Sequence, residues 1–241
     1  MAKKTKLVLR KLKKLLFEKT TRICPICGWK GRQFALGGDG NKQRFDSKCS
    51  RCGSFERHRL AYLVANNMSD LDFSKTVHVA PEKCLSKWLQ LKSSQYLSLD
   101  FYSKAMTKMD ITNLGLASRS CTIFWASNVL EHITDDRKAI SEIYRVLSPG
   151  GKAFIQVPIW KIDTFEDFSK STPEERNELF YQHDHVRLYG MDITDRFEHV
   201  GFSTEIYRAQ DFGPKTLLEN GLSFASTNEV FVFTKVNKPS C

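Results

Sequence analysis

The chain has 241 residues, which is long enough to bury a substantial core and to carry one domain with an appendage. Its hydrophobic fraction of 41% and its charged fraction of 27% are ordinary for a globular protein and exclude wholesale disorder. No stretch approaches the roughly 20 uncharged apolar residues of a membrane-spanning helix, and the first residues lack a secretory-signal pattern. We therefore expect a cytoplasmic protein.

The net charge of +10 is concentrated at the N-terminal end. Residues 1–20 sum to +7 and residues 21–60 to +6, whereas the remainder sums to −3. A basic segment joined to a near-neutral body is typical of a protein that meets an anionic partner, here RNA or a membrane surface. A solvated basic face that aids solubility explains the same pattern.

In chain order, the first predicted element is a basic amphipathic helix within residues 1–20. Leucines recur at helical spacing on one face, and lysines and arginines occupy the other. The basic face would suit RNA or a membrane surface. The leucine face would equally dock on the rest of the protein or on a second copy, so a homodimer is one expectation.

Four of the seven cysteines form two C-x2-C pairs, Cys24/Cys27 and Cys49/Cys52, each followed by glycine. In a cytosolic chain such pairs favour metal binding over disulfides. Two thiolates on a tight turn hold one side of an ion, and two such turns complete a tetrahedral S4 shell, which selects zinc. We predict a structural zinc in a ribbon-like module over residues 21–55, with redox dithiols or an iron–sulfur centre as alternatives.

From residue 56 onward, strand-like and helix-like stretches alternate. A helix is predicted over 56–68, and an α/β pattern follows it. The predicted strands are 76–80, 96–99, 109–111, 121–127, 153–157, 204–207 and 230–235, and the predicted helices are 81–91, 135–147 and 192–200. This alternation indicates a mostly parallel, doubly wound sheet with helices on both faces and a ligand at the carboxyl ends of its strands.

Three consecutive motifs then carry a resemblance to a known family. They are Ser-Asn-Val-Leu-Glu-His-Ile at 127–133, Tyr-Arg-Val-Leu-Ser-Pro-Gly-Gly at 144–151 and Phe-Ile-Gln-Val-Pro at 154–158. This run resembles the strand-four to strand-five segment of the class I S-adenosylmethionine-dependent methyltransferases, in particular their small-molecule-type branch. The resemblance covers about residues 55–235. It implies a Rossmann-like methyltransferase domain over 56–241, with S-adenosylmethionine as cofactor.

The N-terminal motifs extend this resemblance. Cys-Pro-x-Cys-Gly from residue 24, Cys-x-x-Cys-Gly-Ser-Phe-Glu-Arg-His-Arg from 49 and Asp-His-Val-Arg-Leu-Tyr-Gly from 184 look like a bacterial subgroup. That subgroup fuses a cysteine ribbon to the methyltransferase fold. The resemblance to this subgroup does not identify the molecule that accepts the methyl group.

Aligned on these motifs, the resemblance assigns cofactor-binding roles to residues at the strand ends. Asp100, at the end of strand two, would accept hydrogen bonds from both ribose hydroxyls, as its counterpart does in dinucleotide-binding folds. Asp110 and Ile111 would bind the adenine amino group and ring. Ser127 and Asn128, at the end of strand four, would line the methionine arm. The alternative for the two aspartates is the capping of surface loops.

The loop after strand one departs from the family pattern, because residues 77–84 contain no glycine. Ala80, Pro81 and Glu82 would there border the methionine moiety. Glu82 would repel its carboxylate while accepting from its ammonium. Arg57 or Arg59 would supply the missing positive partner. We interpret the loop as an altered cofactor pocket; loss of cofactor binding is the alternative.

Methyl transfer needs mainly in-line positioning of the acceptor, and a hydroxyl acceptor also benefits from a histidine base. His185, beside Asp184 in a polar loop after strand five, is the predicted catalytic base, against a capping or structural role. His132, at the start of a helix beneath the same pocket, is as readily structural.

The predicted function is methyl transfer to a small-molecule or carbohydrate-type acceptor, with the ribbon as acceptor wall or dimer contact. An RNA methyltransferase is the first alternative, favoured by the basic N-terminal end. It is disfavoured by the slightly acidic methylase body and by the absent Asn-Pro-Pro-Tyr/Phe signature of many base methylases. The second alternative is a non-catalytic scaffold that keeps the fold.

Overall fold

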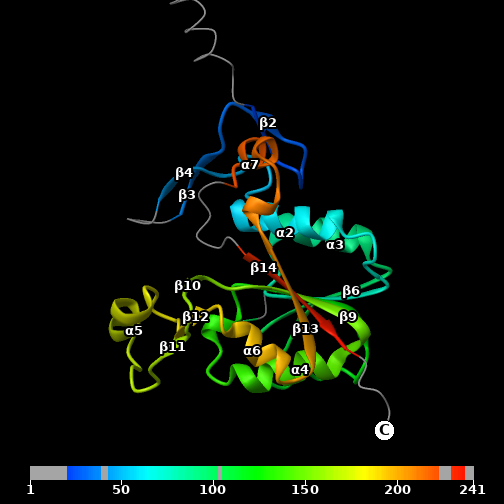
Figure 1. Ribbon diagram of the computed structural model, residues 1–241, viewed down its shortest axis with the longest axis vertical. Coiled ribbons are helices and arrows are strands. Elements are labelled where there is room, and N and C mark those ends of the chain that lie inside the picture. Colours follow the sequence, from blue (N-terminus) through cyan, green and yellow to red (C-terminus); the bar gives the residue numbers. More distant parts are fainter. Residues whose placement is uncertain (1–20, 39–42, 103–104, 223–228, 237–241) are drawn as a thin grey trace, which may run out of the picture.

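A computed structural model describes residues 21–38, 43–102, 105–222 and 229–236, and Figure 1 shows how its elements are arranged. The basic helix predicted within residues 1–20 lies outside the described residues. Among the residues described, no helix is both long enough and apolar enough to cross a membrane.

The central sheet has seven strands: β5 (Lys75–Val79), β6 (Gln95–Asp100), β7 (Thr107–Lys108), β8 (Cys121–Ser127), β9 (Leu147–Gln156), β13 (Phe202–Arg208) and β14 (Glu229–Lys235). Their order is β13-β14-β9-β8-β5-β6-β7. The strands from β9 to β7 pair in parallel, whereas β14 runs antiparallel to both β9 and β13. The predicted mostly parallel sheet is therefore confirmed, with an antiparallel pair at one edge.

Helices cover both faces of this sheet. Helices α2 (Glu56–Asn67) and α3 (Lys83–Lys92) lie on one face, and α4 (Asp136–Val146) and α6 (Ile193–Glu198) lie on the other (Figure 1). Strand β8 explains the division, because successive side chains of a strand point to opposite faces. Trp125 packs in the cluster that holds Leu60 and Leu85, whereas Phe124 packs with Ile140 and Ile143. Both faces are thus apolar and buried.

The strand order places a crevice at the middle of the sheet. The chain leaves β5 through α3 to reach β6 on one side, while β8 pairs with β5 on the other side. Connections that leave two neighbouring parallel strands in opposite directions open a gap at their carboxyl ends, where ligands bind in such folds. Here that gap lies beyond Val79, Asp100 and Ser127.

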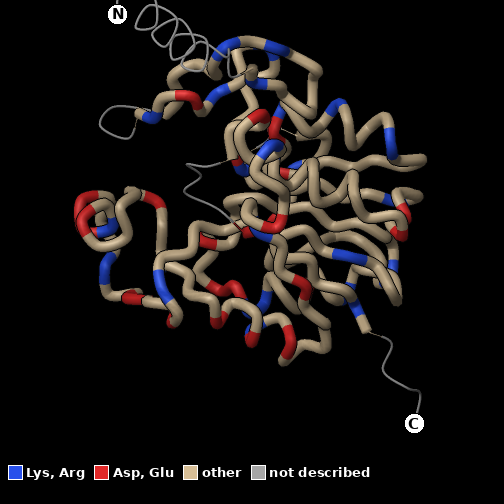
Figure 2. The backbone as a smooth tube through the Cα atoms, turned by 45° about the horizontal axis from the view of Figure 1, so that its top comes forward, with Lys and Arg blue, Asp and Glu red and all other residues tan. Residues whose placement is uncertain are grey.

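A small module precedes α2. It contains two antiparallel pairs, β1 (Arg22–Ile23) with β2 (Lys30–Gly31) and β3 (Ala35–Gly37) with β4 (Arg44–Lys48). Helix α7 (Pro214–Asn220), from the C-terminal part of the chain, lies beside it (Figure 1). The module is thereby held between α2 and α7. Lys and Arg residues are spread along it, while Asp and Glu gather toward the other end of the molecule (Figure 2).

A second small unit follows β9. Strands β10 (Ile159–Lys161), β11 (Phe165–Glu166) and β12 (Arg187–Gly190) form a three-stranded sheet, from which α5 (Pro173–Phe180) projects. The buried Arg187 anchors this unit, because it donates to Glu166 Oε1 at 2.6 Å and to the carbonyls of Leu130, Ile133 and Thr134. The unit is thereby fixed beside the carboxyl end of β8.

Two predicted elements are corrected by the structure. The short strand predicted near 109–111 is β7, which lies two residues earlier and ends at Lys108, since the Asp110 carboxylate accepts from Thr112 N at 2.8 Å. A side chain that bonds its own backbone in this way competes with a strand ladder. The helix predicted from residue 81 begins at Lys83 instead, because Glu82 is an extended N-cap.

Candidate functional site

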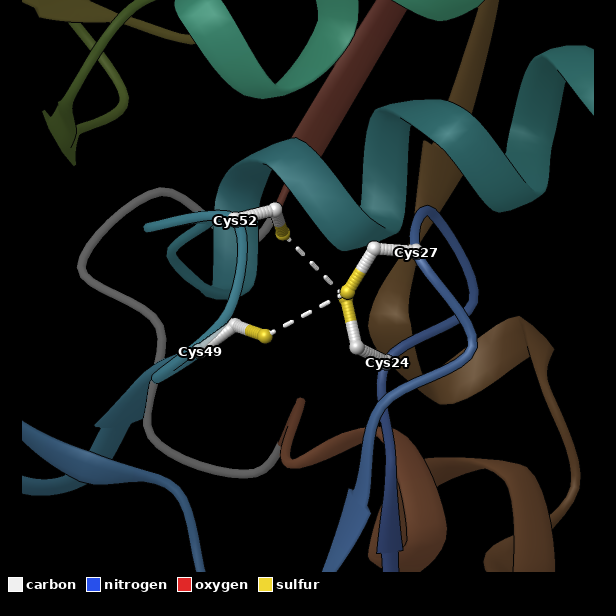
Figure 3. Close-up of side chains that lie close together, drawn as sticks. All are labelled: Cys24, Cys27, Cys49 and Cys52. Carbon is white, nitrogen blue, oxygen red and sulfur yellow. Dashed lines mark hydrogen bonds between the residues drawn. The ribbon is translucent and has the colours of Figure 1, made fainter.

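The four paired cysteines converge on one point. Cys24 Sγ lies 3.6 Å from Cys52 Sγ, and Cys27 Sγ lies 3.6 Å from Cys49 Sγ. All four sulfur atoms lie within 4.8 Å of one another, and Figure 3 shows them pointing inward from two separate turns. Tetrahedral zinc with Zn–S bonds of about 2.3 Å needs sulfur atoms about 3.8 Å apart. The cluster is therefore compatible with a zinc ion.

The two cysteine turns are built alike. Gly28 N donates to Cys24 O at 2.8 Å, and Gly53 N donates to Cys49 O at 2.9 Å. Gly28 has φ +70° and Gly53 has φ +74°, which is a conformation that favours glycine. The glycine after each second cysteine is thus required by the turn that aims both sulfur atoms at one ion.

A cavity of about 370 Å³ opens at the carboxyl ends of β5, β6 and β8. Its lining includes three residues that follow these strands or end them, Ala80, Asp100 and Asn128. Asp110 and Ile111 line it from the turn after β7. A cavity of this size at a switch point of a parallel sheet is a typical site for a cofactor.

Two residues of the cavity wall have unusual backbone conformations. Ala80 has φ +46° and Asn128 has φ +55°, both in the left-handed region that costs a residue with a Cβ roughly 1–2 kcal/mol. Ala80 is held there by its N–H, which donates to Leu99 O at 2.8 Å. The loop after β5 thus makes a turn suited to glycine without containing one.

Beside the cavity lies a group of buried polar atoms that have no hydrogen-bond partner in the described part of the chain. Asn128, which lines the cavity, donates through Nδ2 to Glu131 Oε1 at 3.0 Å and so connects this group to the cavity. Unsatisfied buried polar atoms are costly and rare in folded proteins. The atoms are Arg57 Nε, His58 Nε2, Glu82 Oε1, Asn128 Oδ1 and Glu131 Oε2.

Glu82 does not line the cavity but faces two histidines. Its Oε2 lies 2.6 Å from His78 Nε2, and its Oε1 lies 3.8 Å from His58 Nε2. Burial opposes ionisation of Glu82, but the hydrogen bond from His78 and the other interactions of the carboxyl with its neighbours together outweigh burial and lower its pKa. Burial and the nearby Arg57 lower the pKa of His58 to about 3, so this imidazole is neutral. Its Nδ1 accepts from Phe55 N, which leaves the proton on Nε2, toward Glu82.

Arg57 lies within the reach of two buried carboxyl groups. Burial lowers the pKa of its guanidinium, and the charges of Glu82 and Glu131 only partly offset that effect. Burial also raises the pKa of Glu131. Arg59, the other arginine considered for the cofactor, is turned the opposite way and bonds backbone carbonyls of the N-terminal module and of α7.

One wall of the cavity is formed by His132 and Asp184, and His185 lies behind it. His132 Nδ1 lies 3.3 Å from both the backbone oxygen and the Oδ2 of Asp184. The ring of His185 stands edge-on to that of His132, with centroids 4.7 Å apart. His132 and Asp184 line the cavity, whereas His185 is 7% exposed and lies outside the lining. Partial burial disfavours the charged Asp184, but His132 lowers the pKa of its carboxyl on balance.

The structure brings six of the predicted site residues to the lining of this cavity and leaves five outside it, of which His185 is described above. Pro81 and Glu82 follow Ala80 without lining it, and Arg57 lies behind. Ser127 is buried beneath, where its Oγ donates to Gln156 Oε1 at 3.1 Å. The residues that do line the cavity are Ala80, Asp100, Asp110, Ile111, Asn128 and Asp184.

Several residues of the site were not singled out from the sequence. Arg176 of α5 lines the cavity, and so do Phe101 and Tyr102 after β6. No local pattern distinguishes these side chains from ordinary surface residues. His58 was identifiable, since it stands between two arginines in the string that ends the cysteine module.

Comparisons with known proteins agree with this geometry. Residues 56–155 match the family model described as a methyltransferase domain. No curated protein sequence matches the chain. The structure resembles an S-adenosylmethionine-dependent methyltransferase from Mesorhizobium loti, at 12% identity and a TM-score of 0.53, over 72% of this chain and 96% of that one.

Two further structures have the same fold. YcgJ from Bacillus subtilis superposes with a TM-score of 0.51 at 12% identity, over 75% of this chain and all 100% of its own. The (4+2)-cyclase SpnF does so with a TM-score of 0.51 at 11% identity, over 86% of this chain and 87% of its own. At these identities the likeness concerns the fold, on which different reactions occur.

The seven-stranded sheet and the cavity at its switch point have the Rossmann-like fold of class I methyltransferases. Within that fold, residues 56–155 match the methyltransferase-domain model.

Proposed function

We propose that this protein transfers a methyl group from S-adenosylmethionine to a small-molecule or carbohydrate-type acceptor in the cavity beside Asp100 and Asn128. The observation that carries the proposal is the cavity at the switch point together with the adjoining unsatisfied polar atoms. The bound cofactor supplies a methyl group that its sulfonium already activates. The protein's part is then to bind, orient and exclude water.

The nucleoside half of the cofactor belongs between β6 and the turn after β7. Asp100 Oδ1 accepts from Tyr102 N at 2.7 Å, which fixes the carboxylate at the cavity wall. The remaining acceptor positions of the Asp100 carboxylate would accept hydrogen bonds from the two ribose hydroxyls. Asp110 would accept from the adenine amino group, and Ile111, which is 3% exposed, would bear on the ring.

The methionine half belongs beside Ala80 and Pro81, where the unsatisfied atoms gather. The guanidinium of Arg57 would pair with the carboxylate of the ligand. Asn128, which lines the cavity, would accept from its ammonium through Oδ1, which restores the hydrogen bond that this buried oxygen lacks. Ser127 would support this wall through Gln156. The glycine-free loop is on this proposal an altered pocket that still binds the cofactor.

Asp184 and His185 are our proposal for the residues that handle the acceptor. Asp184 lines the cavity itself, whereas His185 acts through His132, against whose ring it packs. We also propose that the four cysteines hold a structural zinc. Because the S4 shell is closed, that ion would stabilise the N-terminal module and take no part in the reaction.

An RNA acceptor is the second candidate, and one observation favours it. The described part of the N-terminal module carries six Lys and Arg residues and the single acidic residue Asp46, and the side chain of Phe45 is 82% exposed. Basic groups with an exposed aromatic suit single-stranded nucleic acid. The same face would serve a membrane surface or a dimer contact, and turnover with a steep salt dependence would select RNA.

Calorimetric titration of the zinc-loaded protein with S-adenosylhomocysteine tests the cofactor site. We expect binding that Asp100→Ala weakens about 10- to 100-fold, because one or two hydrogen bonds to a charged group are lost. The matched control is Asp167→Ala, since Asp167 makes the same local bond, to Ser169 N at 3.0 Å, away from the cavity. Absence of binding to the wild type would overturn the proposal in favour of a scaffold.

A further inference from the structure

Three side chains of the types that bind metals lie together beside the cavity, which one of them lines, and they form a group separate from the four cysteines. Glu131, His132 and His185 place their ligand atoms within 4.8 Å of one another. The first two lie in the 3₁₀ helix Leu130–His132, and His185 lies in the loop before β12. Val186 N donates to Glu131 O at 3.0 Å and ties the two segments together. The cluster is therefore fixed by the backbone.

A second observation points to a ligand at this cluster. Glu131 is 1% exposed, and its Oε1 accepts from Asn128 Nδ2. Its Oε2 is buried and has no hydrogen-bond partner in the described part of the chain. A buried carboxylate oxygen is costly unless it meets a hydrogen bond, an ion partner or a metal. No group in the described part of the chain hydrogen-bonds this atom, although its carboxylate belongs to the cluster with the two imidazoles.

The surroundings of His132 have the form found around metal-bound histidines. Such histidines present one nitrogen to the ion and donate from the other to a carboxylate or a carbonyl. His132 Nδ1 lies 3.3 Å from Oδ2 and from the backbone oxygen of Asp184. This contact would leave Nε2 for the ion. Arg187, bonded to the carbonyls of Leu130 and Thr134 at either end of the turn, holds the ligands in place.

We propose that Glu131, His132 and His185 bind one divalent first-row transition-metal cation, and that its open positions take two neighbouring oxygens of the acceptor. Two imidazoles and one carboxylate suit Mn²⁺, Fe²⁺, Co²⁺ or Zn²⁺ and leave coordination positions free, unlike the closed S4 shell. The part about the acceptor rests on the proposed function, whereas the binding of the cation does not.

The proposal names a class of acceptor and changes the role of His185. A vicinal diol or a hydroxy acid can fill two adjacent positions of one cation, as a carbohydrate-type acceptor would. The cation lowers the pKa of a bound hydroxyl, so a free imidazole base is not needed. His185 is then a metal ligand rather than a proton acceptor, and Asp184 is a positioning residue that orients His132.

The binding of Mn²⁺ to protein that carries one equivalent of zinc, in its cysteine cluster, tests the site and is followed by the loss of the free-ion electron paramagnetic resonance signal. Mn²⁺ is chosen because it disfavours thiolates, and the visible absorption of Co²⁺ serves as a second probe. We expect one bound ion per chain and binding weakened about tenfold or more in Glu131→Gln, His132→Ala and His185→Asn. Asp184→Ala is expected to weaken binding about 10- to 100-fold, because it orients a ligand.

His183→Asn is the matched control, since His183 lies in the same loop but is exposed and outside the cluster, and it is expected to bind Mn²⁺ as the wild type does. Absence of Mn²⁺ and Co²⁺ binding to the folded wild type would overturn the proposal, and so would binding that the ligand variants leave unchanged. Binding of S-adenosylhomocysteine to the same samples separates the two proposals. Binding of the cation without binding of S-adenosylhomocysteine would refute the proposed cofactor site in the cavity but not the proposed metal site.

Discussion

The guanidinium of Arg59 lies over the aromatic ring of Phe34, with its central carbon 3.9 Å from the ring centroid. Arg59 is fully buried, and its nitrogens donate to the backbone oxygens of Ser47, Ser54, Asn220 and Gly221 at 2.7–3.2 Å. One side chain of α2 therefore joins the cysteine module, the methyltransferase domain and the segment after α7.

Replacing Arg59 by lysine should destabilise the protein strongly. Lysine keeps the charge but cannot reach four carbonyls or stack on Phe34 as the planar guanidinium does. We expect a loss of about 2–4 kcal/mol in the free energy of unfolding, measured by urea denaturation of the zinc-loaded protein. Arg51→Lys, which removes one exposed bond to Cys27 O, should change it by less than about 0.5 kcal/mol. Equal effects of the two variants would contradict the prediction.

The loop after β5 should be improved by the glycine that it lacks. Ala80 has φ +46°, and Ala80→Gly removes the clash of its Cβ in this conformation. We expect stabilisation by about 0.5–1 kcal/mol in thermal or urea unfolding, because the relieved strain exceeds the added entropy of the unfolded chain. Ala117→Gly, at an exposed position without positive φ, should instead destabilise slightly. A destabilised Ala80→Gly would show that the turn is not strained.

The free energy of unfolding should fall as the pH is lowered, because His58 binds a proton more readily in the unfolded chain than in the folded protein. Burial holds the pKa of this imidazole near 3, below its ordinary value of 6.5, so only the unfolded chain binds a proton there between these values. Stability is therefore complete above about pH 6.5 and falls by up to about 1.4 kcal/mol per pH unit below it.

The difference in urea stability between pH 7 and pH 5 should be about 2 kcal/mol smaller in His58→Gln than in the wild type. Glutamine at this third helical position can still accept from Phe55 N, so the helix start is preserved. His199→Asn, at an exposed histidine, should retain the slope of the wild type. If the urea stability of His58→Gln depended on pH as strongly as that of the wild type, another group would be the one that titrates.

Removing one thiolate should empty the metal centre of the module. In the Glu131→Gln background, which removes a ligand of the proposed second site, Cys24→Ser is expected to lower bound zinc from about one ion per chain to below about 0.1, measured by atomic absorption, and to lower the thermal midpoint. Cys84→Ala removes a buried thiol outside the cluster and should retain the zinc. Full zinc content in Cys24→Ser would refute the S4 site.

Sequence patterns could predict the features that depend on neighbouring residues. The C-x2-C-G turns are local, since Gly28 and Gly53 close them with bonds to residues four positions back. Strand and helix alternation follows from apolar periodicity, and it located β8 and the end of β6 correctly. The strand predicted near 109–111 ends earlier, at Lys108, because the short polar side chain of Asp110 bonds its own turn there.

What the sequence determined by itself is thus the α/β class, the cysteine turns and the polar residues at the strand ends, because period and turn chemistry act over a few residues. Only the tertiary structure decided which of these residues meet. Glu82 turns from the cavity to His78, and His185 reaches His132 across 53 positions of the chain. Such contacts depend on how buried elements pack and on where buried charges find partners, which no local pattern records.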